Sequence, residues 1–152
     1  MDCFAQYESP IGMMTLASDS GVLTGLRFGT QESSSADLSL FDEVRRWLDV
    51  YFSGRKPDFT PPLAFYGTEF QKRVWQVLLA IPYGQTVSYG DIARRVGCRS
   101  AQAIGGAVHR NPIAIIVPCH RVIGADGSLI GYASGLERKQ YLLELESAHS
   151  LD

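Results

Sequence analysis

The chain has 152 residues, of which 45% are hydrophobic, and a net charge of −2 at pH 7. This size and composition allow one ordinary domain or two small ones that share an interface. The sequence has no apolar run of the roughly 20 residues that span a bilayer, and it does not begin with the basic-then-apolar pattern of an export signal. We therefore expect a compact cytoplasmic protein without a membrane segment.

The distribution of charge along the chain and the cysteine content further narrow the possible classes of protein. Residues 1–66 hold 5 Lys/Arg against 9 Asp/Glu, whereas residues 67–152 hold 9 against 7. The second half contains a stretch with five arginines and no acid, which would either neutralise phosphates or form a solvated helix face. The three cysteines are too far apart for a Cys-x-x-Cys metal site, and their odd number argues against a disulfide framework. The five arginines are Arg94, Arg95, Arg99, Arg110 and Arg121, and the three cysteines are Cys3, Cys98 and Cys119.

The first part of the chain, residues 1–63, predicts a small antiparallel sheet followed by a helix. Three strand-like segments at 3–7, 13–17 and 22–28 are separated by turn residues. Apolar residues then recur at steps of three and four from Leu38 to Phe52 and stop before Gly54, as in an amphipathic helix. This part has one cysteine and no histidine, so it offers no zinc site.

A proline-rich linker at 56–62 leads into a second domain, residues 64–152, for which we expect a winged helix-turn-helix-like fold. The fold class is therefore α/β. Helices are predicted from Thr68 to Ile81, from Ser88 to Val96 and from Ser100 to Arg110, the first two opening with capping-box patterns. Further elements are a turn at 124–128, a short strand at 129–130, a loop at 131–135, a last helix at 136–147 and a tail that contains His149.

The predicted helix from Ser100 to Arg110 is the one that would enter a DNA groove. It is mostly alanine, glycine and isoleucine. Recognition helices that read base edges are rich in Asn, Gln, Arg and Lys, whereas small residues let a backbone approach the duplex at any sequence. This composition favours sequence-independent docking, although paired short helices also occur in proteins that bind no nucleic acid.

A possible nucleophile follows the β-branched run Ile115–Val117, which predicts a short buried strand. After Pro118 come Cys119 and His120. A lone cysteine among apolar residues is usually an inert part of a core. A thiol has an unperturbed pKa of about 8.5 and needs a base or a positive field to react at neutral pH, and His120 can supply the base.

The segment 111–124, with its Pro-Cys-His-Arg-Val core, resembles the active-site signature of the O6-alkylguanine-DNA alkyltransferases. The resemblance extends to residues 68–71, 81–93, 131–132 and 138–146. It implies irreversible transfer of a methyl or larger alkyl group from guanine O6 onto Cys119, without a cofactor. The implied partner is double-stranded DNA containing O6-alkylguanine, which the protein would read by flipping out the base. We expect the protein to be a monomer.

The resemblance also implies roles for individual residues. His120 would act as the base through a bridging water, Glu146 would orient it, Asn111 would hydrogen-bond behind the cysteine, and Tyr89 would assist base rotation and donate to the leaving guanine. The substrate pocket would include the Val122 carbonyl together with Tyr132, Ala133, Ser134, Lys139 and Val108. The DNA contacts would come from the five arginines and from Ser88, Ser100, Ala101, Gln102, Ala103 and Gly105.

Two positions depart from the common pattern of the family. Gln102 stands where an arginine usually fills the space of the flipped base, and Ala133 stands where serine is frequent.

Two other classes of protein stay open from the residues alone: a helix-turn-helix regulator with an incidental thiol, and a cysteine hydrolase with a Cys-His-Glu constellation. Family members that bind damage without repairing it lack the cysteine, which is present here.

Overall fold

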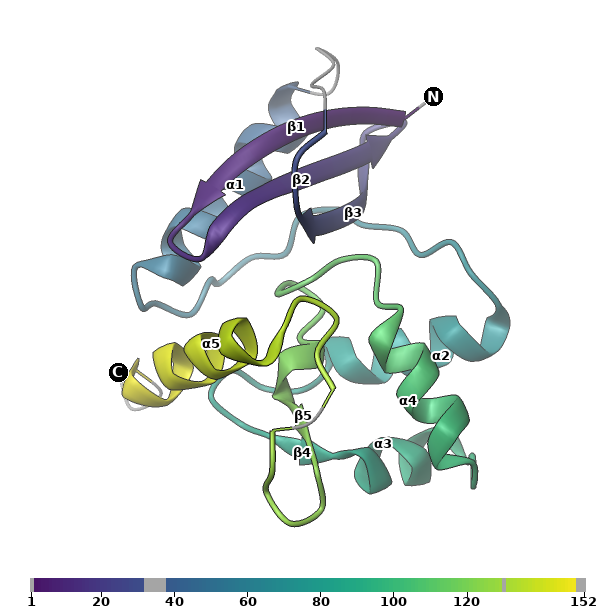
Figure 1. Ribbon diagram of the computed structural model, residues 1–152. Helices are drawn as coiled ribbons and strands as arrows, with labels where there is room; N and C mark the ends of the chain where they lie inside the picture. The colour runs from purple at the N-terminus through teal and green to yellow at the C-terminus, as the bar shows by residue number, and fades with distance from the viewer. Residues whose placement is uncertain (1, 32–37, 130, 150–152) are drawn as a thin grey trace. The chain divides into compact units, whose positions relative to one another are not determined.

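The computed structural model describes residues 2–31, 38–129 and 131–149. The chain forms two compact units (Figure 1). The first contains the residues up to Tyr66 together with Pro112–Ala114, and the second contains Gly67–Asn111 and the chain from Ile115 onward. The domain division at residues 63 and 64 stays a prediction. Among the described residues, no helix is long and apolar enough to cross a membrane.

The first unit is a three-stranded antiparallel sheet with one helix, as the sequence predicts. Strands β1 (Asp2–Ser9), β2 (Gly12–Asp19) and β3 (Val22–Phe28) pair in chain order, and α1 (Leu38–Phe52) lies against the sheet (Figure 1). The Tyr7 hydroxyl donates to Asp49 of α1 at 2.7 Å. The core of this unit includes four fully buried apolar residues: Met14, Leu16, Val44 and Leu48.

The free edge of β3 is covered by a segment that comes much later in the chain. Leu26 N donates to Pro112 O at 2.9 Å, and Ala114 N donates to Leu26 O at 2.8 Å. Leu26 and Ile113 form a parallel bridge. These backbone bonds satisfy polar groups that an open strand edge would expose.

The second unit contains a helix-turn-helix, which confirms the predicted class. Helices α2 (Glu69–Leu79), α3 (Tyr89–Val96) and α4 (Ala101–His109) pack on one another, and Trp75 Nε1 donates to Ala107 O at 2.9 Å. The two predicted capping boxes are present, at Thr68 with Gln71 and at Ser88 with Asp91. Each satisfies otherwise unpaired N–H groups of a helix start.

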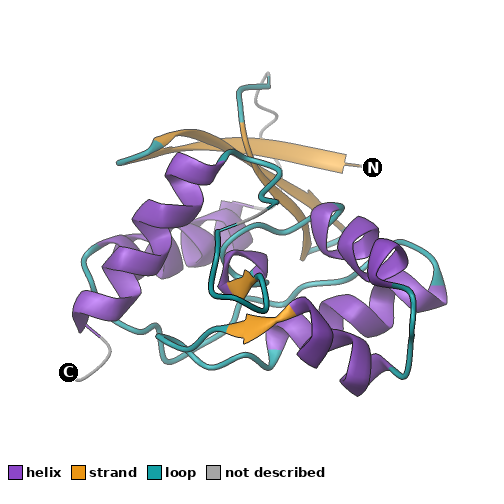
Figure 2. Ribbon diagram, turned by 60° about the horizontal axis from the view of Figure 1, so that its bottom comes forward, coloured by secondary structure: helices purple, strands orange, loops and turns teal. Residues whose placement is uncertain are grey.

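Beside these helices the unit holds a small parallel strand pair, β4 (Val87–Ser88) and β5 (Val122–Ile123) (Figure 2). The short 3-10 helix η1 (Cys119–Arg121) leads directly into β5. The last helix, α5 (Leu136–His149), contacts η1. It runs further than the predicted end at residue 147, so the backbone of His149 is helical rather than part of a tail.

The predicted strand at Ile115–Val117 is wrong. These residues are buried but form a turn, in which Ile115 has a φ of +67°. A positive φ is uncommon for a β-branched residue and is incompatible with a regular strand. The apolar run reflected complete burial, which a buried turn and a buried strand share. Leu129 is likewise outside any strand, and Ile130 lies outside the described residues.

The turn between α3 and α4 depends on Gly97, which ends α3 in the left-handed conformation at a φ of +77°. We expect Gly97→Ala to lower the free energy of unfolding by about 1 kcal/mol, because a Cβ disfavours this backbone conformation. Gly105→Ala adds the same methyl inside α4, where it would meet no atom within 4 Å. It should raise stability by up to about 1 kcal/mol. Urea unfolding measures both; equal effects of the two variants would contradict this account.

Candidate active site

The centre of the second unit is a buried carboxylate that accepts hydrogen bonds on both oxygens. Oε1 of Glu146, on α5, accepts from Arg121 Nε at 2.7 Å and from Gly84 N at 3.1 Å. Oε2 lies 2.5 Å from His120 Nε2 and accepts from Arg121 Nη2 at 3.1 Å. The α5 helix, η1 and the loop before β4 therefore meet at one carboxylate.

Burial makes these contacts strong. The His120 and Glu146 side chains are only 0% and 1% exposed. Burial alone would raise the pKa of Glu146, but the hydrogen bonds and charges of His120 and Arg121 oppose it and lower the pKa to about 2. Burial lowers the pKa of His120, and Glu146 only partly offsets this effect. Glu146 is thus an anion, and His120 tends to be neutral.

Arg121 does not lie with the exposed arginines. Besides its two bonds to Glu146, its Nη1 donates to Ile81 O at 2.7 Å, and its guanidinium carbon lies 5.6 Å from the centre of the Tyr83 ring. The residue is 7% exposed. The sequence-based assignment of Arg121 to DNA contacts therefore finds no support in this position, because its hydrogen-bonding groups face inward.

Cys119 occupies the first position of η1 and is 7% exposed. Burial raises the pKa of its thiol, while a hydrogen bond from Asn111 and the charge of Lys139 lower it. Lys139, on α5, is fully buried, and its Nζ donates to Val122 O at 2.5 Å. The backbone carbonyl expected to accept from guanine thus accepts from a lysine in this structure.

Other predicted site residues surround the thiol. Asn111 Nδ2 donates to Val117 O at 2.7 Å and so fixes the chain just ahead of Cys119. The Tyr89 hydroxyl donates to Gly131 O at 3.3 Å. Burial raises the pKa of Tyr89 and raises that of Tyr132 further, and a negative charge on Cys119 would raise both. Both phenols therefore remain protonated donors at neutral pH.

The remaining substrate candidates divide into two groups. Ala133 is exposed and Ser134 is half-buried on the loop before α5, where Arg138 donates to the Ser134 carbonyl at 3.2 Å. Val108 is 3% exposed and belongs to the buried face of α4. A side-chain contact between Val108 and a substrate is not supported by this position.

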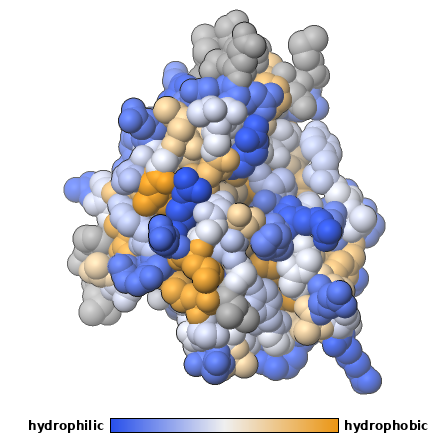
Figure 3. All heavy atoms as spheres, viewed as in Figure 1, coloured by the Kyte–Doolittle hydropathy of each residue, from blue (hydrophilic) through white to orange (hydrophobic). Residues whose placement is uncertain are grey.

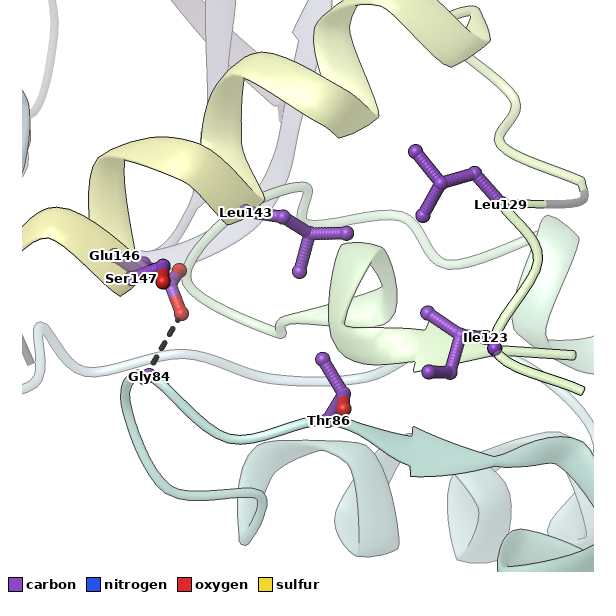
Figure 4. Close-up of a pocket in the computed structure, with 8 residues that line it drawn as sticks. Gly84, Thr86, Ile123, Leu129, Leu143, Glu146 and Ser147 are labelled. Carbon is purple, nitrogen blue, oxygen red and sulfur yellow. Dashed lines mark hydrogen bonds between the residues drawn. The ribbon is translucent and has the colours of Figure 1, made fainter. Parts of the chain in front are cut away.

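A pocket of about 360 Å³ opens beside Glu146, and the bond from Gly84 to Glu146 crosses its wall (Figure 4). Apolar side chains line much of it, and Figure 3 shows a hydrophobic area on this face, where α5 and β5 lie in Figure 1. Cys119 does not line this pocket. The pocket gives solvent a position next to the carboxylate rather than next to the thiol. Its lining residues are Gly84, Thr86, Ile123, Gly127, Leu129, Leu143, Glu146 and Ser147.

The residues expected to contact DNA gather around α3 and α4. Ser88 and Ser100 cap these helices by accepting from Asp91 N and Ala103 N. Gly105 is half-buried, and a Cβ there would meet open space. Ser100 is exposed, and so are the remaining residues of this group: Arg94, Arg95, Arg99, Ala101, Gln102, Ala103 and Arg110. No group of three His, Cys, Asp or Glu residues that could hold a metal occurs in the described part of the chain.

The sequence did not reveal the partners of Glu146 other than His120. Gly84 contributes through its backbone, which leaves no trace in residue type. Arg121 offered one signal. It precedes two β-branched residues, Val122 and Ile123, which indicate a buried segment. Because buried arginines are rare unless they are paired, an arginine at this place indicates a charged partner.

The fold and the site together define a helix-turn-helix unit that carries a buried thiol, imidazole and carboxylate. Residues 69–148 match the family model for the 6-O-methylguanine DNA methyltransferase DNA-binding domain, and residues 3–65 match that for its ribonuclease-like domain. The chain belongs to the 6-O-methylguanine DNA methyltransferase family, as the resemblance in its sequence indicated.

Relatives and solved structures agree with this assignment. The methylated-DNA–protein-cysteine methyltransferase of Mycobacterium leprae is 53% identical over 91% of this chain and 88% of its own. That of Methanosarcina acetivorans is 48% identical over 95% and 98%. The structure of Mycobacterium tuberculosis OGT in complex with DNA matches with a TM-score of 0.87 at 49% identity, covering 96% of this chain and 93% of that one.

The lowered pKa of Glu146 predicts an acid-sensitive fold. Because the folded chain holds this carboxyl as an anion down to about pH 2, the unfolded chain takes up the proton first as the pH falls. Stability from this group is complete above pH ~4.5 and is lost between pH ~4.5 and ~2, by roughly 3 kcal/mol. Urea midpoints across this range should fall for the natural chain. Glu146→Gln should be less stable at pH 7 and flatter below pH ~4.5; parallel curves would contradict the assignment.

Proposed function

We propose that this protein repairs DNA by moving a methyl or larger alkyl group from guanine O6 to its own Cys119, once and irreversibly. The observation that carries the proposal is a buried thiol, Cys119, adjacent in sequence to a buried imidazole, His120, whose Nε2 lies 2.5 Å from Glu146 Oε2. The similarity to the methylated-DNA–protein-cysteine methyltransferases of Mycobacterium leprae and Methanosarcina acetivorans supports it. We further propose that it works without a cofactor, as a monomer, in the cytoplasm.

The transfer is a substitution at the alkyl carbon. His120 takes the proton from Cys119 Sγ, the S–C bond forms, and the C–O bond breaks with its electron pair left on guanine. Tyr89, held protonated by burial, donates a proton to the leaving guanine and recovers one from the imidazolium. The net change is a thioether in place of the thiol, with the thiol proton ending on guanine.

DNA enters this scheme through the helix-turn-helix. Exposed arginines at α3 and in the turn before α4 would bind phosphates, and the small residues at the start of α4 would allow close approach. Cys119 is buried, so the damaged base must leave the stack to reach it. Asn111 would hold the backbone before the nucleophile, while Tyr132, Ala133 and Ser134 would border the base.

A regulator and a hydrolase remain the competing classes, and the fate of the thiol separates them. A regulator would leave Cys119 unchanged, and a hydrolase would regenerate it.

Incubation with duplex DNA containing O6-methylguanine should add one methyl group to the intact protein, located on Cys119 by peptide mass spectrometry. Cys119→Ser should abolish the addition and leave duplex affinity nearly unchanged, because the sulfur contributes to chemistry rather than to phosphate contacts. The matched control is Cys98→Ser, which removes a more exposed thiol and should still gain one methyl. A methyl on Cys98, or none on the natural chain, would refute the proposal.

Gln102 gives a second prediction. It is exposed near the start of α4 and carries no charge, whereas an arginine there could fill the space of an extruded nucleotide. We expect Gln102→Arg to tighten duplex binding and to steepen its salt dependence by up to about one phosphate contact. Arg99, in the turn before α4, could already supply that charge. If Gln102→Arg changes nothing while Arg99→Ala weakens binding and flattens the slope, Arg99 holds the role instead.

A further inference from the structure

We infer that Arg138 is a substrate-positioning residue, which binds the backbone phosphate of the nucleotide whose base is delivered to Cys119. The inference rests on the proposed function, because it needs a flipped nucleotide at the site. The other expected DNA contacts gather around α3 and α4. Arg138 adds a contact on α5, at the loop that would border the base, and its ligand is a phosphodiester beside the lesion.

The loop at residues 131–135 leads into α5 (Figure 1) and contains one buried side chain. Tyr132 is 8% exposed, and its buried hydroxyl has no hydrogen-bond partner among the described residues. Most buried polar groups are hydrogen-bonded, so this hydroxyl marks a place that a ligand would complete. Burial raises the pKa of Tyr132, and a negative charge on Cys119 would raise it further, because the two groups are close. The buried side of the loop is therefore where the base would lie.

Arg138 lies over the same loop, on its more exposed side. Helical side chains lean toward the N-terminus of their helix, so a residue in the first turn of α5 covers the segment ahead of it. Arg138 is half-buried, and its Nη1 donates to Ser134 O at 3.2 Å. Burial raises the pKa of Tyr132, and the guanidinium charge of Arg138 partly opposes this effect. Arg138 is thus within electrostatic reach of the base position but closer to solvent than Tyr132.

The two adjacent cations of α5 have different surroundings. Lys139 is fully buried, donates to Val122 O, and opposes by its charge the effect of burial on the pKa of Cys119. Successive residues of a helix point about 100° apart, so Arg138 does not share this inward face, and the exposed Glu137 points away from both. The inward cation acts on the thiol, whereas the half-buried one suits an anion that stays at the surface.

A flipped nucleotide supplies that anion. Its base moves inward to the thiol, while its phosphodiester remains part of the strand outside. A contact to this phosphate fixes where the base enters, which contacts at the helix-turn-helix alone would constrain less. A guanidinium has five N–H donors in a planar fork that matches a phosphate, and the bond to Ser134 does not exhaust them. That bond orients the fork before DNA binds.

The alternative role for Arg138 is to clamp the loop through Ser134 without touching DNA. Free O6-methylguanine separates the two roles, because it carries the reacting C–O bond but no phosphate. A clamp serves both substrates equally, whereas a phosphate contact serves only the DNA.

Single-turnover methyl transfer to Cys119, followed by mass spectrometry, is compared for damaged duplex and free base. We expect Arg138→Gln to lose about tenfold more in the second-order rate constant on the duplex than on the free base, because a charge-assisted hydrogen bond is lost. Arg138→Lys should recover part of the duplex rate, since the charge remains. The matched control, Arg55→Gln, removes an exposed charge from the first unit and should change neither rate. Equal losses of Arg138→Gln on both substrates would overturn the inference.

A neutral phosphate tests the contact itself. A methylphosphonate removes the charge of one phosphate and is placed in turn on each side of the lesion. We expect one position to slow the natural chain about tenfold and to have little further effect on Arg138→Gln, whose side of the contact is already missing. Arg95→Gln, which removes an exposed charge on α3, should weaken duplex binding but keep the full sensitivity. A natural chain insensitive to both positions, or an Arg138→Gln variant as sensitive as the natural chain, contradicts the inference.

The failure of the inference is distinguishable from that of the proposed function. If the natural chain gains no methyl from either substrate, the proposed function fails. If it gains one and the variants of Arg138 behave as a clamp predicts, only the inference fails. If Arg138→Gln does not fold, Arg138→Lys takes its place in the methylphosphonate series, where loss of the fork should reduce the sensitivity. Sensitivity equal to that of the natural chain would then decide against the phosphate contact.

Discussion

The buried carboxylate of Glu146 is the constraint on which the second unit depends. An unpaired anion in a protein interior is so unfavourable that removing one partner of a buried ion pair costs about 3 to 5 kcal/mol. Glu146 therefore needs its contacts with His120, with the Gly84 backbone and with Arg121 all at once. Because α5 carries Glu146 and Lys139, this one helix both anchors His120 and places a cation near Cys119. The fold and the site are stabilised by the same bonds.

Local features of the fold were the easiest to predict from sequence. The capping boxes at Thr68 and Ser88 each involve residues within a stretch of four. The residues of the predicted pattern are the same ones that form the hydrogen bonds. The turn at Ile115 could not be predicted in this way, since an apolar run reports burial and says nothing of a positive φ. Of the site, the sequence brought together Cys119 and His120, which are adjacent. Glu146 entered only through the resemblance to a family.

Arg121 and Arg94 show why residue type alone cannot assign an arginine. Both belong to the same acid-free stretch of the sequence, yet Arg94 is exposed on α3 and Arg121 is buried. The carboxylate that decides the difference is 25 residues away from Arg121 in the chain. Under the proposed function, a count of basic residues therefore overestimates by one the arginines that can reach DNA phosphates. The exposed arginines at the helix-turn-helix would be the ones that release counterions on binding DNA.

Burial of the thiol explains how a protein that acts once can remain intact until it meets damage. An exposed thiolate would react with oxidants and with any electrophile, and each such reaction would consume a molecule. At 7% exposure, and with a pKa raised by burial, Cys119 is less accessible to such reagents than an exposed thiolate would be. The same burial prevents attack on a base that stays within the duplex, so reactivity requires delivery of a flipped nucleotide. Under the proposed function, the buried thiol and the DNA-docking helix built from small residues therefore act together: Cys119 reacts only with a base that DNA binding has delivered to it.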